Sequence, residues 1–354
     1  MTTTYNVIGL MSGTSLDGLD IAYCIFINND NKWSFEIKKA CCIPYSADWE
    51  KKLSTADQLS AFELLNLHNE YGYYLGTETK KFIEKYHIHI DFIASHGHTV
   101  FHQPAKKITC QIGSGECIAA SSGLSVINDF RSMDVALGGQ GAPLVPVGDS
   151  FLFADYDFCI NLGGFANLSY QFNNERIAYD ICPVNIILNP LALELGFPYD
   201  DKGLLAEKGS IHQSLLNELE QLEYYHQSHP KSLGKEWVIK EFLPIVSKYE
   251  LSVYDQLRTL SEHIVFQILK ATKSSKNGRL LFTGGGTYND FMIRLIKTNS
   301  NHSVIIPNKI IIDFKEAMIF AFLGVLRYRG EVNCLKSVTG AANDNIGGKI
   351  IIVK

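Results

Sequence analysis

The chain has 354 residues, more than one ordinary domain holds, so two domains are expected. Apolar residues make up 46% and charged residues 19%, a composition that excludes a disordered protein and a charge-rich coiled coil. The net charge of −5 gives no electrostatic reason to bind nucleic acid or an anionic membrane surface, although a nest of backbone amides can hold an anion even in an acidic protein.

The N-terminal sequence and the cysteines indicate a protein of the cytoplasm. The first residues contain no basic segment followed by a long apolar stretch, so no signal peptide is expected. No apolar run approaches the ~18 residues of a membrane span. The 8 cysteines are scattered without a paired CxxC pattern, so we expect reduced thiols rather than disulfides or a zinc site.

Two segments separated by about one domain length follow the same plan. Residues 5–27 place the glycine-bearing stretch 11–18 between two apolar runs, and residues 156–172 repeat this plan around 161–167. Branched and aromatic residues on both sides of a glycine turn are typical of a β-hairpin. The repeat predicts two similar domains, residues 1–150 and 151–354, each opening with a turn directed at a shared cleft.

Apolar periodicity predicts helices between and after the hairpins. One helix is expected over about 61–86, with a face formed by Phe62, Leu65, Tyr71, Leu75 and Phe82. A second stripe over 257–269 precedes a predicted buried strand at 280–283, and a last helix is expected over 316–329. These final helical elements could pack back on the first domain. Strands alternating with helices predict an α/β fold.

Three glycine turns each follow a predicted strand, and together they favour a site for a nucleoside triphosphate. Glycine lets backbone N–H groups face phosphate oxygens, hydroxyl groups add donors, and a carboxylate can hold a water of a magnesium shell. An ordinary hairpin turn is the alternative for the first turn, since the GxxxxGK[ST] signature is absent. The candidate nucleotide-binding residues are Gly13, Thr14, Ser15, Asp17, Gly18, Asp20, Gly163, Gly164, Gly284, Gly285 and Gly286.

A series of short blocks closely resembles the anhydro-N-acetylmuramic acid kinases. The blocks are MSGTSLDGLD (11–20), SHGHT (95–99), NDFR (128–131), GGQGAPLVP (138–146), NLGGFAN (161–167), PKSLGK (230–235), GGG (284–286), EA (316–317) and SVTGA (337–341). They occur in the family's order and cover nearly the whole chain, which makes them far more specific than any single glycine motif.

The resemblance implies a fold and a reaction. The fold is the two-domain, actin-like ATPase fold of sugar kinases, with central mixed sheets of the ribonuclease H-like type, flanking helices and an interdomain cleft. The reaction couples hydrolytic opening of the 1,6-anhydro ring of anhydromuramic acid to phosphoryl transfer from ATP with Mg²⁺, giving N-acetylmuramic acid 6-phosphate in cell-wall recycling. The resemblance also implies a homodimer.

The resemblance further implies roles for single residues. Asp180 matches the catalytic base, and His98, Thr99, Arg131 and Glu316 match positions at the sugar site; no residue is assigned as a direct metal ligand. Arginine suits the lactyl carboxylate of a muramic sugar because its planar fork binds carboxylates in a fixed geometry.

Each role has a structural alternative that the sequence leaves open. Asp180 could be a turn or cap aspartate before Pro183, and Arg131 a surface arginine after a strand. Glu316 also suits the first turn of a helix, where a carboxylate favours the helix dipole. His96 and His98 could contact sugar or merely make a loop polar, because no third metal ligand is evident.

The chain departs from the family's pattern at several positions. In the segment Asp180–Asn185, Cys182 and Val184 replace glycines, which predicts a reshaped or strained loop beside the base. His98 stands at a usual glutamine position, and Asp149 where a histidine is common. Three alternatives therefore remain: a kinase for another sugar, a sensor without catalysis and, more remotely, an actin-like filament.

Overall fold

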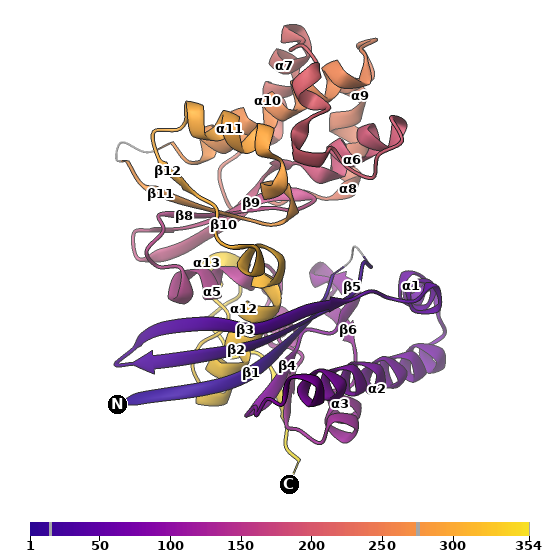
Figure 1. The fold of residues 1–354 in the computed structure, drawn as a ribbon, viewed down its shortest axis with the longest axis vertical. Helices are drawn as coiled ribbons and strands as arrows, with labels where there is room; N and C mark the ends of the chain where they lie inside the picture. Colours follow the sequence, from indigo (N-terminus) through magenta and orange to yellow (C-terminus); the bar gives the residue numbers. More distant parts are fainter. Residues whose placement is uncertain (14–15, 274–276, 354) are drawn as a thin grey trace. The chain divides into compact units, whose positions relative to one another are not determined.

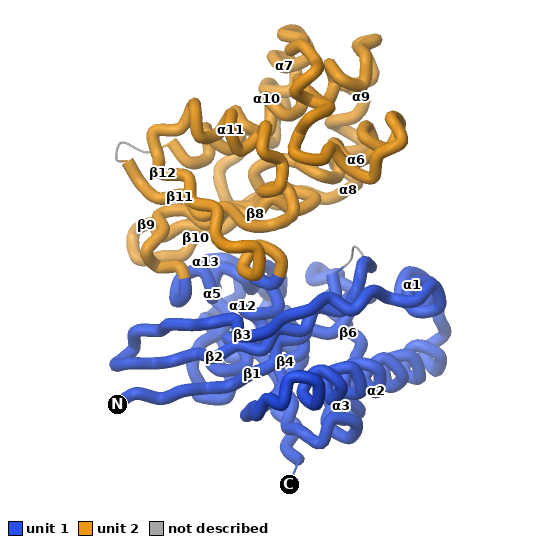
Figure 2. The backbone as a smooth tube through the Cα atoms, in the orientation of Figure 1, with its two compact units in different colours: residues 1–152, 314–354 blue, residues 153–313 orange. Residues whose placement is uncertain are grey.

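The computed structural model describes residues 1–13, 16–273 and 277–353 (Figure 1). The chain forms two compact units: unit 1 is Met1–Leu152 together with Phe314–Lys354, and unit 2 is Phe153–Asp313 (Figure 2). The chain therefore leaves unit 1 after Leu152 and returns to it at Phe314. The predicted second domain, residues 151–354, ends in helical elements that could pack back on the first domain, and residues 314–354 group with the first 152 residues.

Unit 1 is built on a six-stranded sheet with the order β13-β7-β4-β1-β2-β3. Its strands are β1 (Thr2–Ser12), β2 (Leu19–Asn29), β3 (Lys32–Ile43), β4 (Phe92–Ser95), β7 (Val126–Asn128) and β13 (Lys349–Ile351). β1, β2 and β3 form an antiparallel meander, while β4 and β7 continue the sheet parallel to β1. A separate two-stranded ladder pairs β5 (His98–Gln103) with β6 (Ile108–Ile112).

Helices cover both faces of this sheet (Figure 1). The helices of unit 1 are α1 (Ala47–Ser54), α2 (Ala61–Tyr86), α3 (Gly115–Ser122), α4 (Ser132–Ala136), α5 (Val145–Leu152), α13 (Lys336–Thr339) and, from Phe314 on, α12 (Lys309–Arg329). Side chains alternate along β1, so Ile8 and Leu10 join a core with α2 and α3. Gly9 faces the other way, where a Cβ would lie 1.9 Å from the carbonyl oxygen of Ala317 in α12.

The helix predicted over 61–86 is confirmed as α2, but its predicted face is partly wrong. Tyr71, Leu75 and Phe82 are buried, whereas Phe62 and Leu65 are 81% and 64% exposed. At about 100° per residue, Phe62 lies on the opposite side of the helix from Tyr71.

The two glycines of α2 are explained by its contact with α3. A Cβ at Gly72 would lie 2.7 Å from the carbonyl oxygen of Ser114, and one at Gly76 would lie 2.6 Å from that of Ile118. The glycines that weaken the helical pattern are therefore the residues that let the two helices approach.

Unit 2 contains a five-stranded sheet with the order β10-β9-β8-β11-β12. Its strands are β8 (Phe158–Leu162), β9 (Phe165–Phe172), β10 (Glu175–Pro183), β11 (Arg279–Thr283) and β12 (Ser303–Ile305). Its helices are α6 (Asn185–Glu194), α7 (Gln213–Glu220), α8 (Lys235–Trp237), α9 (Leu243–Val246), α10 (Val253–Ala271) and α11 (Asp290–Asn299). Ile160 and Leu162 of β8 pack with Leu257, Leu260 and other residues of α10 in one core.

The two units share the order of five strands, to which unit 1 adds β13 at its edge, antiparallel to β7. In each, three antiparallel strands are followed by a long helix, and two further strands then extend the sheet parallel to the first strand. The predicted hairpins are β1–β2 and β8–β9, and the predicted strand and helix at 280–283 and 257–269 are β11 and α10. The predicted α/β fold of two lobes with mixed sheets is confirmed; the cleft shared by the two lobes stays a prediction.

Two expectations about the whole chain can be compared with the structure. All 8 cysteines are unpaired. Among the helices in the described part of the chain, none combines the length and apolar content that a membrane span needs.

Candidate functional site

The turn between β1 and β2 carries the first glycine motif. Gly13 follows β1 directly, whereas Thr14 and Ser15 lie outside the described residues. The side chain of Asp17 is exposed. A Cβ at Gly18 would lie 2.6 Å from the carbonyl oxygen of Ile43, so packing against β3 already requires glycine there.

Asp20 and Asp17 are the carboxylates of this turn. Asp20 is half-buried and pairs across the sheet with Cys42 of β3. Burial, and then the charge of Asp20 and its hydrogen bond to the thiol, raise the pKa of Cys42 to about 12. Carboxylate oxygens are the ligands that Mg²⁺ prefers. Within the described residues, no three His, Cys, Asp or Glu side chains form a metal cage, so a magnesium held here would keep waters and phosphate oxygens as ligands.

Unit 2 places Asp180 in a polar row that crosses four strands. Asp180 of β10 pairs with Asn167 of β9, Asn167 pairs with Asn161 of β8, and Asn161 pairs with Thr283 of β11. Directly paired residues of neighbouring strands have side chains on the same face of the sheet. The row lies at the carboxyl ends of β8 and β11, the edge at which open α/β sheets bind ligands.

Both glycine turns of unit 2 follow this row immediately. Gly284 has a φ of +84°, and a Cβ there would lie 2.8 Å from the carbonyl oxygen of Leu162, so backbone and packing both require glycine. At Gly286 a Cβ would lie 2.7 Å from the Cβ of Leu162. The third and second turns therefore lie against each other.

Two other glycines of these turns have no such steric reason. Gly164 and Gly285 are exposed, neither is in the left-handed region, and a Cβ at either would meet nothing within 4 Å. Gly163 is different, because a Cβ there would make a tight contact of 3.3 Å with Nδ2 of Asn161; its N–H donates to the carbonyl oxygen of Phe165 at 3.1 Å. A ligand that approaches the backbone gives a physical reason for glycine at Gly164 and Gly285, and phosphate groups fit such a cradle.

The carboxylate of Asp180 is held by the segment 231–233. Its Oδ2 accepts a hydrogen bond from the N–H of Leu233 at 2.8 Å, and its carbonyl oxygen accepts one from the hydroxyl of Tyr224 at 2.6 Å. Burial raises the pKa of the carboxyl, and the bond from Leu233 opposes this shift. In the part of the chain that the structure describes, no group is hydrogen-bonded to Oδ1, which leaves that oxygen to accept a proton.

The segment Asp180–Asn185 joins β10 to α6 and rules out the structural alternative for Asp180. Asp180 is neither a turn nor a cap residue: it lies within β10, and the residue at the N-cap of α6 is Val184. Neither Cys182 nor Val184 has the positive φ that a glycine would allow, but the segment is reshaped, because the pairing of β10 with β9 shifts register between Asp180 and Cys182. Both side chains are fully buried in the core of unit 2, so the residues that replace glycine extend the hydrophobic packing.

Arg131 is fixed by three groups of unit 1. Its Nε donates to Nε2 of His96 at 3.0 Å, its Nη1 donates to the carbonyl oxygen of Gly141 at 2.5 Å, and its guanidinium lies 5.9 Å from the ring centre of Phe320. Burial lowers the pKa of Arg131 to about 10. Arg131 is therefore not a plain surface arginine, and Nη2 has no hydrogen-bond partner among the described residues.

His96 must be neutral to hold Arg131 in this way. Its Nε2 accepts from the guanidinium, so its proton is on Nδ1, which donates to the carbonyl oxygen of Gly97 at 2.9 Å. Burial, and then the charge of Arg131, depress the pKa of His96 well below its usual value.

Glu316 lies on α12 near Arg131, two residues after a kink at Phe314. Its side chain keeps access to solvent, although the surrounding protein raises the pKa of its carboxyl; the charges of Arg131 and Lys315 oppose this rise. Glu316 is thus near Arg131 and also close to the start of the helical segment that follows the kink. A role at the sugar site and a place in the first turn of a helix are therefore compatible.

An ion pair next to Glu316 explains one departure from the family's pattern. Nζ of Lys315 lies 2.7 Å from Oδ1 of Asp149, and the two side chains are only 6% and 5% exposed. The unusual aspartate therefore neutralises a buried lysine, which fixes the start of this helical segment to α5.

His98 and Thr99 occupy the start of β5. Nδ1 of the buried His98 lies 3.1 Å from Oγ of Ser12, the last residue of β1, and Oγ1 of Thr99 accepts from Nε2 of Gln111 at 3.3 Å. Unit 1 therefore joins His98 to the first glycine turn through Ser12, and joins His96 to Arg131 on the other side of Gly97.

Sequence reasoning missed four polar contributors to these sites. Asn161 and Asn167 lie in a block that was recognised, and their spacing of three residues on either side of Gly164 could have predicted that they pair. Tyr45, whose hydroxyl donates to Oγ of Ser12 at 2.8 Å, carries no signal in its local sequence. Nor does Lys315, whose partner is far away in the chain.

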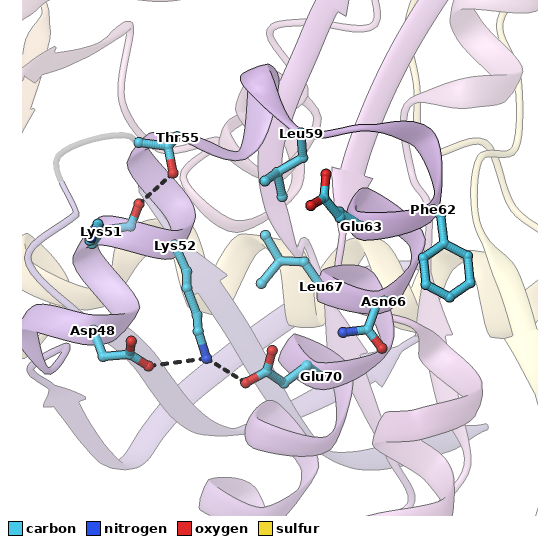
Figure 3. A pocket seen from close by; sticks show the side chains of 10 residues that line it. All are labelled: Asp48, Lys51, Lys52, Thr55, Leu59, Phe62, Glu63, Asn66, Leu67 and Glu70. Carbon is cyan, nitrogen blue, oxygen red and sulfur yellow. Dashed lines mark hydrogen bonds and ion pairs between the residues drawn. The ribbon is translucent and has the colours of Figure 1, made fainter.

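A groove of about 330 Å³ lies elsewhere on unit 1, between α1 and α2 (Figure 3). Lys52 lies between Asp48 and Glu70 there, at 3.0 and 2.6 Å, and the exposed ring of Phe62 forms part of the lining. None of the predicted site residues lines this groove, which separates it from the chemistry considered above.

Comparison with known proteins assigns the chain to a family. The family model "Anhydro-N-acetylmuramic acid kinase" matches residues 5–352. Proteins of that name from Hydrogenovibrio crunogenus and Vibrio cholerae are 31% and 33% identical, over 97% and 95% of this chain and the same shares of their own lengths.

Two solved structures show only distant similarity. Component A of the (R)-2-hydroxyglutaryl-CoA dehydratase of Acidaminococcus fermentans has a TM-score of 0.42 at 12% identity, covering 91% of this chain and 96% of its own. A ROK family glucokinase of Streptomyces griseus has a TM-score of 0.39 at 11% identity, covering 90% and 98%. Similarity this low supports no inference about chemistry. The match to the family model over nearly the full length, together with relatives above 30% identity, shows that the chain belongs to the anhydro-N-acetylmuramic acid kinase family.

Proposed function

We propose that the chain opens 1,6-anhydro-N-acetylmuramic acid by hydrolysis and phosphorylates it with ATP, giving N-acetylmuramic acid 6-phosphate for cell-wall recycling. The observation that carries the proposal is the polar row of unit 2, which ends in Asp180 and is followed directly by two glycine turns. Family membership supports the same reaction.

In the proposed mechanism Asp180 is the general base. Its free Oδ1 takes a proton from a water molecule, whose oxygen attacks the anomeric carbon of the sugar. The bond from that carbon to the 6-oxygen breaks, and the 6-oxygen bonds to the γ-phosphorus of ATP as ADP leaves. The raised pKa of Asp180 suits this role, because a more basic carboxylate accepts a proton more readily.

The other groups bind and orient the two substrates. The backbone at Gly13, Gly164 and Gly285 would supply donors to phosphate oxygens, and Asp17 and Asp20 would hold Mg²⁺ through water, an ion that would neutralise phosphate charge. Arg131 would hold the lactyl carboxylate through Nη2, since its other nitrogens are occupied by protein. We assign His98, Thr99 and Glu316 to hydrogen bonds with the sugar.

The test is product analysis in water enriched in heavy oxygen. Protein, MgATP and the anhydro sugar should give ADP and a sugar phosphate that carries the label at the anomeric carbon. Unlabelled sugar phosphate would instead indicate simple phosphoryl transfer to another hydroxyl. Tight binding of both ligands without any product would indicate a sensor and overturn the proposal.

We further propose that the enzyme works in the cytoplasm as a homodimer. The unpaired cysteines support a reducing compartment. Sedimentation should give twice the chain mass of 39.6 kDa, and a single-chain mass at working concentration would contradict the dimer.

A further inference from the structure

We propose that His98 is a hydrogen-bond donor to the substrate, fixed as the Nε2–H tautomer by the buried hydroxyl groups of Tyr45 and Ser12, to which the hydroxyl of Tyr71 is also bonded. The inference rests on the proposed function, because it takes the ligand of His98 to be the sugar. It goes further by assigning the atom that contacts the sugar, the direction of the hydrogen bond and the residues that set it.

The hydroxyl chain is continuous and buried. The hydroxyls of Tyr71 and Tyr45 are 2.6 Å apart, the hydroxyl of Tyr45 donates to Oγ of Ser12 at 2.8 Å, and Oγ lies 3.1 Å from Nδ1 of His98. All four side chains are at most 6% exposed. A buried hydroxyl whose proton has no acceptor is costly, so each proton in the chain must be placed.

Placing the protons fixes the tautomer of His98. The hydroxyl of Tyr45 has one proton and donates it to Ser12. The proton of the hydrogen bond between Tyr45 and Tyr71 therefore comes from Tyr71. The proton of Ser12 can then go to the phenol oxygen of Tyr71 or to Nδ1 of His98, and the bare imidazole nitrogen is the stronger acceptor of the two. Nδ1 is therefore unprotonated, and the single N–H of the neutral ring is on Nε2. The pKa of His98 is lowered by burial, which keeps the ring in this neutral form.

His98 and His96 are consequently fixed in opposite tautomers on either side of Gly97. His96 uses both ring nitrogens within the protein, one on Gly97 and one on Arg131. His98 uses only Nδ1, and no described residue is hydrogen-bonded to Nε2. The ring therefore presents a donor and cannot accept, so its partner is an oxygen acceptor such as a carbonyl, a carboxylate or an ether oxygen. A glutamine at this position could donate or accept.

The tautomer can be measured without any assay of activity. Nitrogen NMR of protein labelled only at its 11 histidines distinguishes the two neutral tautomers, and the variant His98→Gln identifies the signals of His98 by their loss. The expected result is an Nε2–H ring for His98 and an Nδ1–H ring for His96. An Nδ1–H ring for His98 would overturn the proposal whether or not the protein is a kinase.

A matched pair of variants tests the role of the hydroxyl chain. Tyr45→Phe removes the donor to Ser12, whose oxygen can then accept from the ring, so signals of the Nδ1–H tautomer should appear. Tyr71→Phe removes one hydroxyl of the same chain but leaves the bond from Tyr45 to Ser12, so His98 should keep its tautomer. Equal spectra for the two variants would contradict the role of Tyr45 in setting the tautomer. If both variants fail to fold, the tautomer of His98 in the native protein decides the proposal.

Kinetics then test the contact with the sugar. His98→Leu should raise KM for the sugar about tenfold, the worth of one buried hydrogen bond, with KM for ATP unchanged. His98→Gln restores a donor and should recover most of the loss. An unchanged sugar KM in active His98→Leu protein would remove the donor role, while failure of the native protein to turn over the sugar would concern the proposed function instead.

Discussion

At the scale of single residues, Asp180 and Arg131 are each held by protein contacts that leave one polar atom unused. For Asp180 that atom is Oδ1, because Oδ2 is bound to the N–H of Leu233. For Arg131 it is Nη2, because Nε and Nη1 are bound to His96 and Gly141. Such anchoring orders a side chain before the ligand arrives, which reduces the entropy lost on binding.

Replacing Asp180 by asparagine tests the base. Asp180→Asn should lower kcat at least about 100-fold, because general base catalysis is lost, while ATP binding stays near normal. The fold should persist, since the amide oxygen can still accept from the N–H of Leu233. Calorimetric titration with ATP is the control, and turnover close to the native rate would contradict the assignment.

The raised pKa of Asp180 also predicts how stability depends on pH. The folded protein binds this proton more tightly than the unfolded chain, so the carboxyl contributes a loss of stability as pH rises from the unfolded pKa through the folded one. Asp180→Asn should therefore match the native protein in acid and gain relative stability at neutral pH. Urea unfolding of both proteins at acid and neutral pH measures the difference in the free energy of unfolding. A variant that is more stable than the native protein only in acid would contradict the prediction.

Arg131→Lys tests the anchored guanidinium. An ammonium cannot keep the bonds to His96 and Gly141 and still present a donor in the same place, so KM for the sugar should rise about 10- to 100-fold. KM for ATP should change little. A sugar KM within twofold of the native value would show that Arg131 does not contact the substrate.

At the scale of elements, helix packing on the first sheet depends on glycine. Gly9→Ala would bring a Cβ to 1.9 Å from the backbone of Ala317, and backbone cannot move aside as a flexible side chain can. We expect a loss of about 3 kcal/mol in the free energy of unfolding. Gly285→Ala, where a Cβ meets nothing within 4 Å, is the matched control for stability. Equal denaturation midpoints for the two variants would contradict this account of α12.

Elements defined by local pattern could be predicted from the sequence, and contacts between distant segments could not. The hairpins β1–β2 and β8–β9 and the helix α10 follow from alternation, turn residues and helical period. The burial of Phe62 was predicted wrongly because the residue is apolar but its angular position around the helix axis is opposite that of the buried Tyr71.

The candidate site divides in the same way. Asp180 and the glycine turns are recognisable as motifs, whereas the ion pair of Lys315 with Asp149 joins residues that only the folded chain brings together. The bonds of His96 and Tyr45 are likewise set by tertiary packing, which no local pattern encodes.

At the scale of the whole molecule, unit 1 is completed by the C-terminal segment. Every residue from Ala317 to Leu326 is buried, and Phe322 packs against Phe26 and Trp33 of unit 1. The buried carboxylate of Asp134 accepts hydrogen bonds from Thr339 at 2.8 Å and from Asn345 at 2.9 Å.

Fragments should show this dependence. Residues 1–152 alone should aggregate or fail to unfold cooperatively, because the face of β1 around Gly9 would lose α12. The same residues joined through a flexible linker to 314–354 should give a cooperative thermal transition. Calorimetry compares the two fragments, and cooperative unfolding of 1–152 alone would contradict the prediction.

The path of the chain has a consequence for biosynthesis. Domains generally fold as units while the ribosome is still extending the chain. Here the ribosome must finish almost the entire polypeptide before the helix that seals the first sheet exists, whereas all of unit 2 has been synthesised by then. Unit 1, whose synthesis begins first, should therefore finish folding last. Until α12 is made, the uncovered face of its sheet is the surface to which a chaperone would bind.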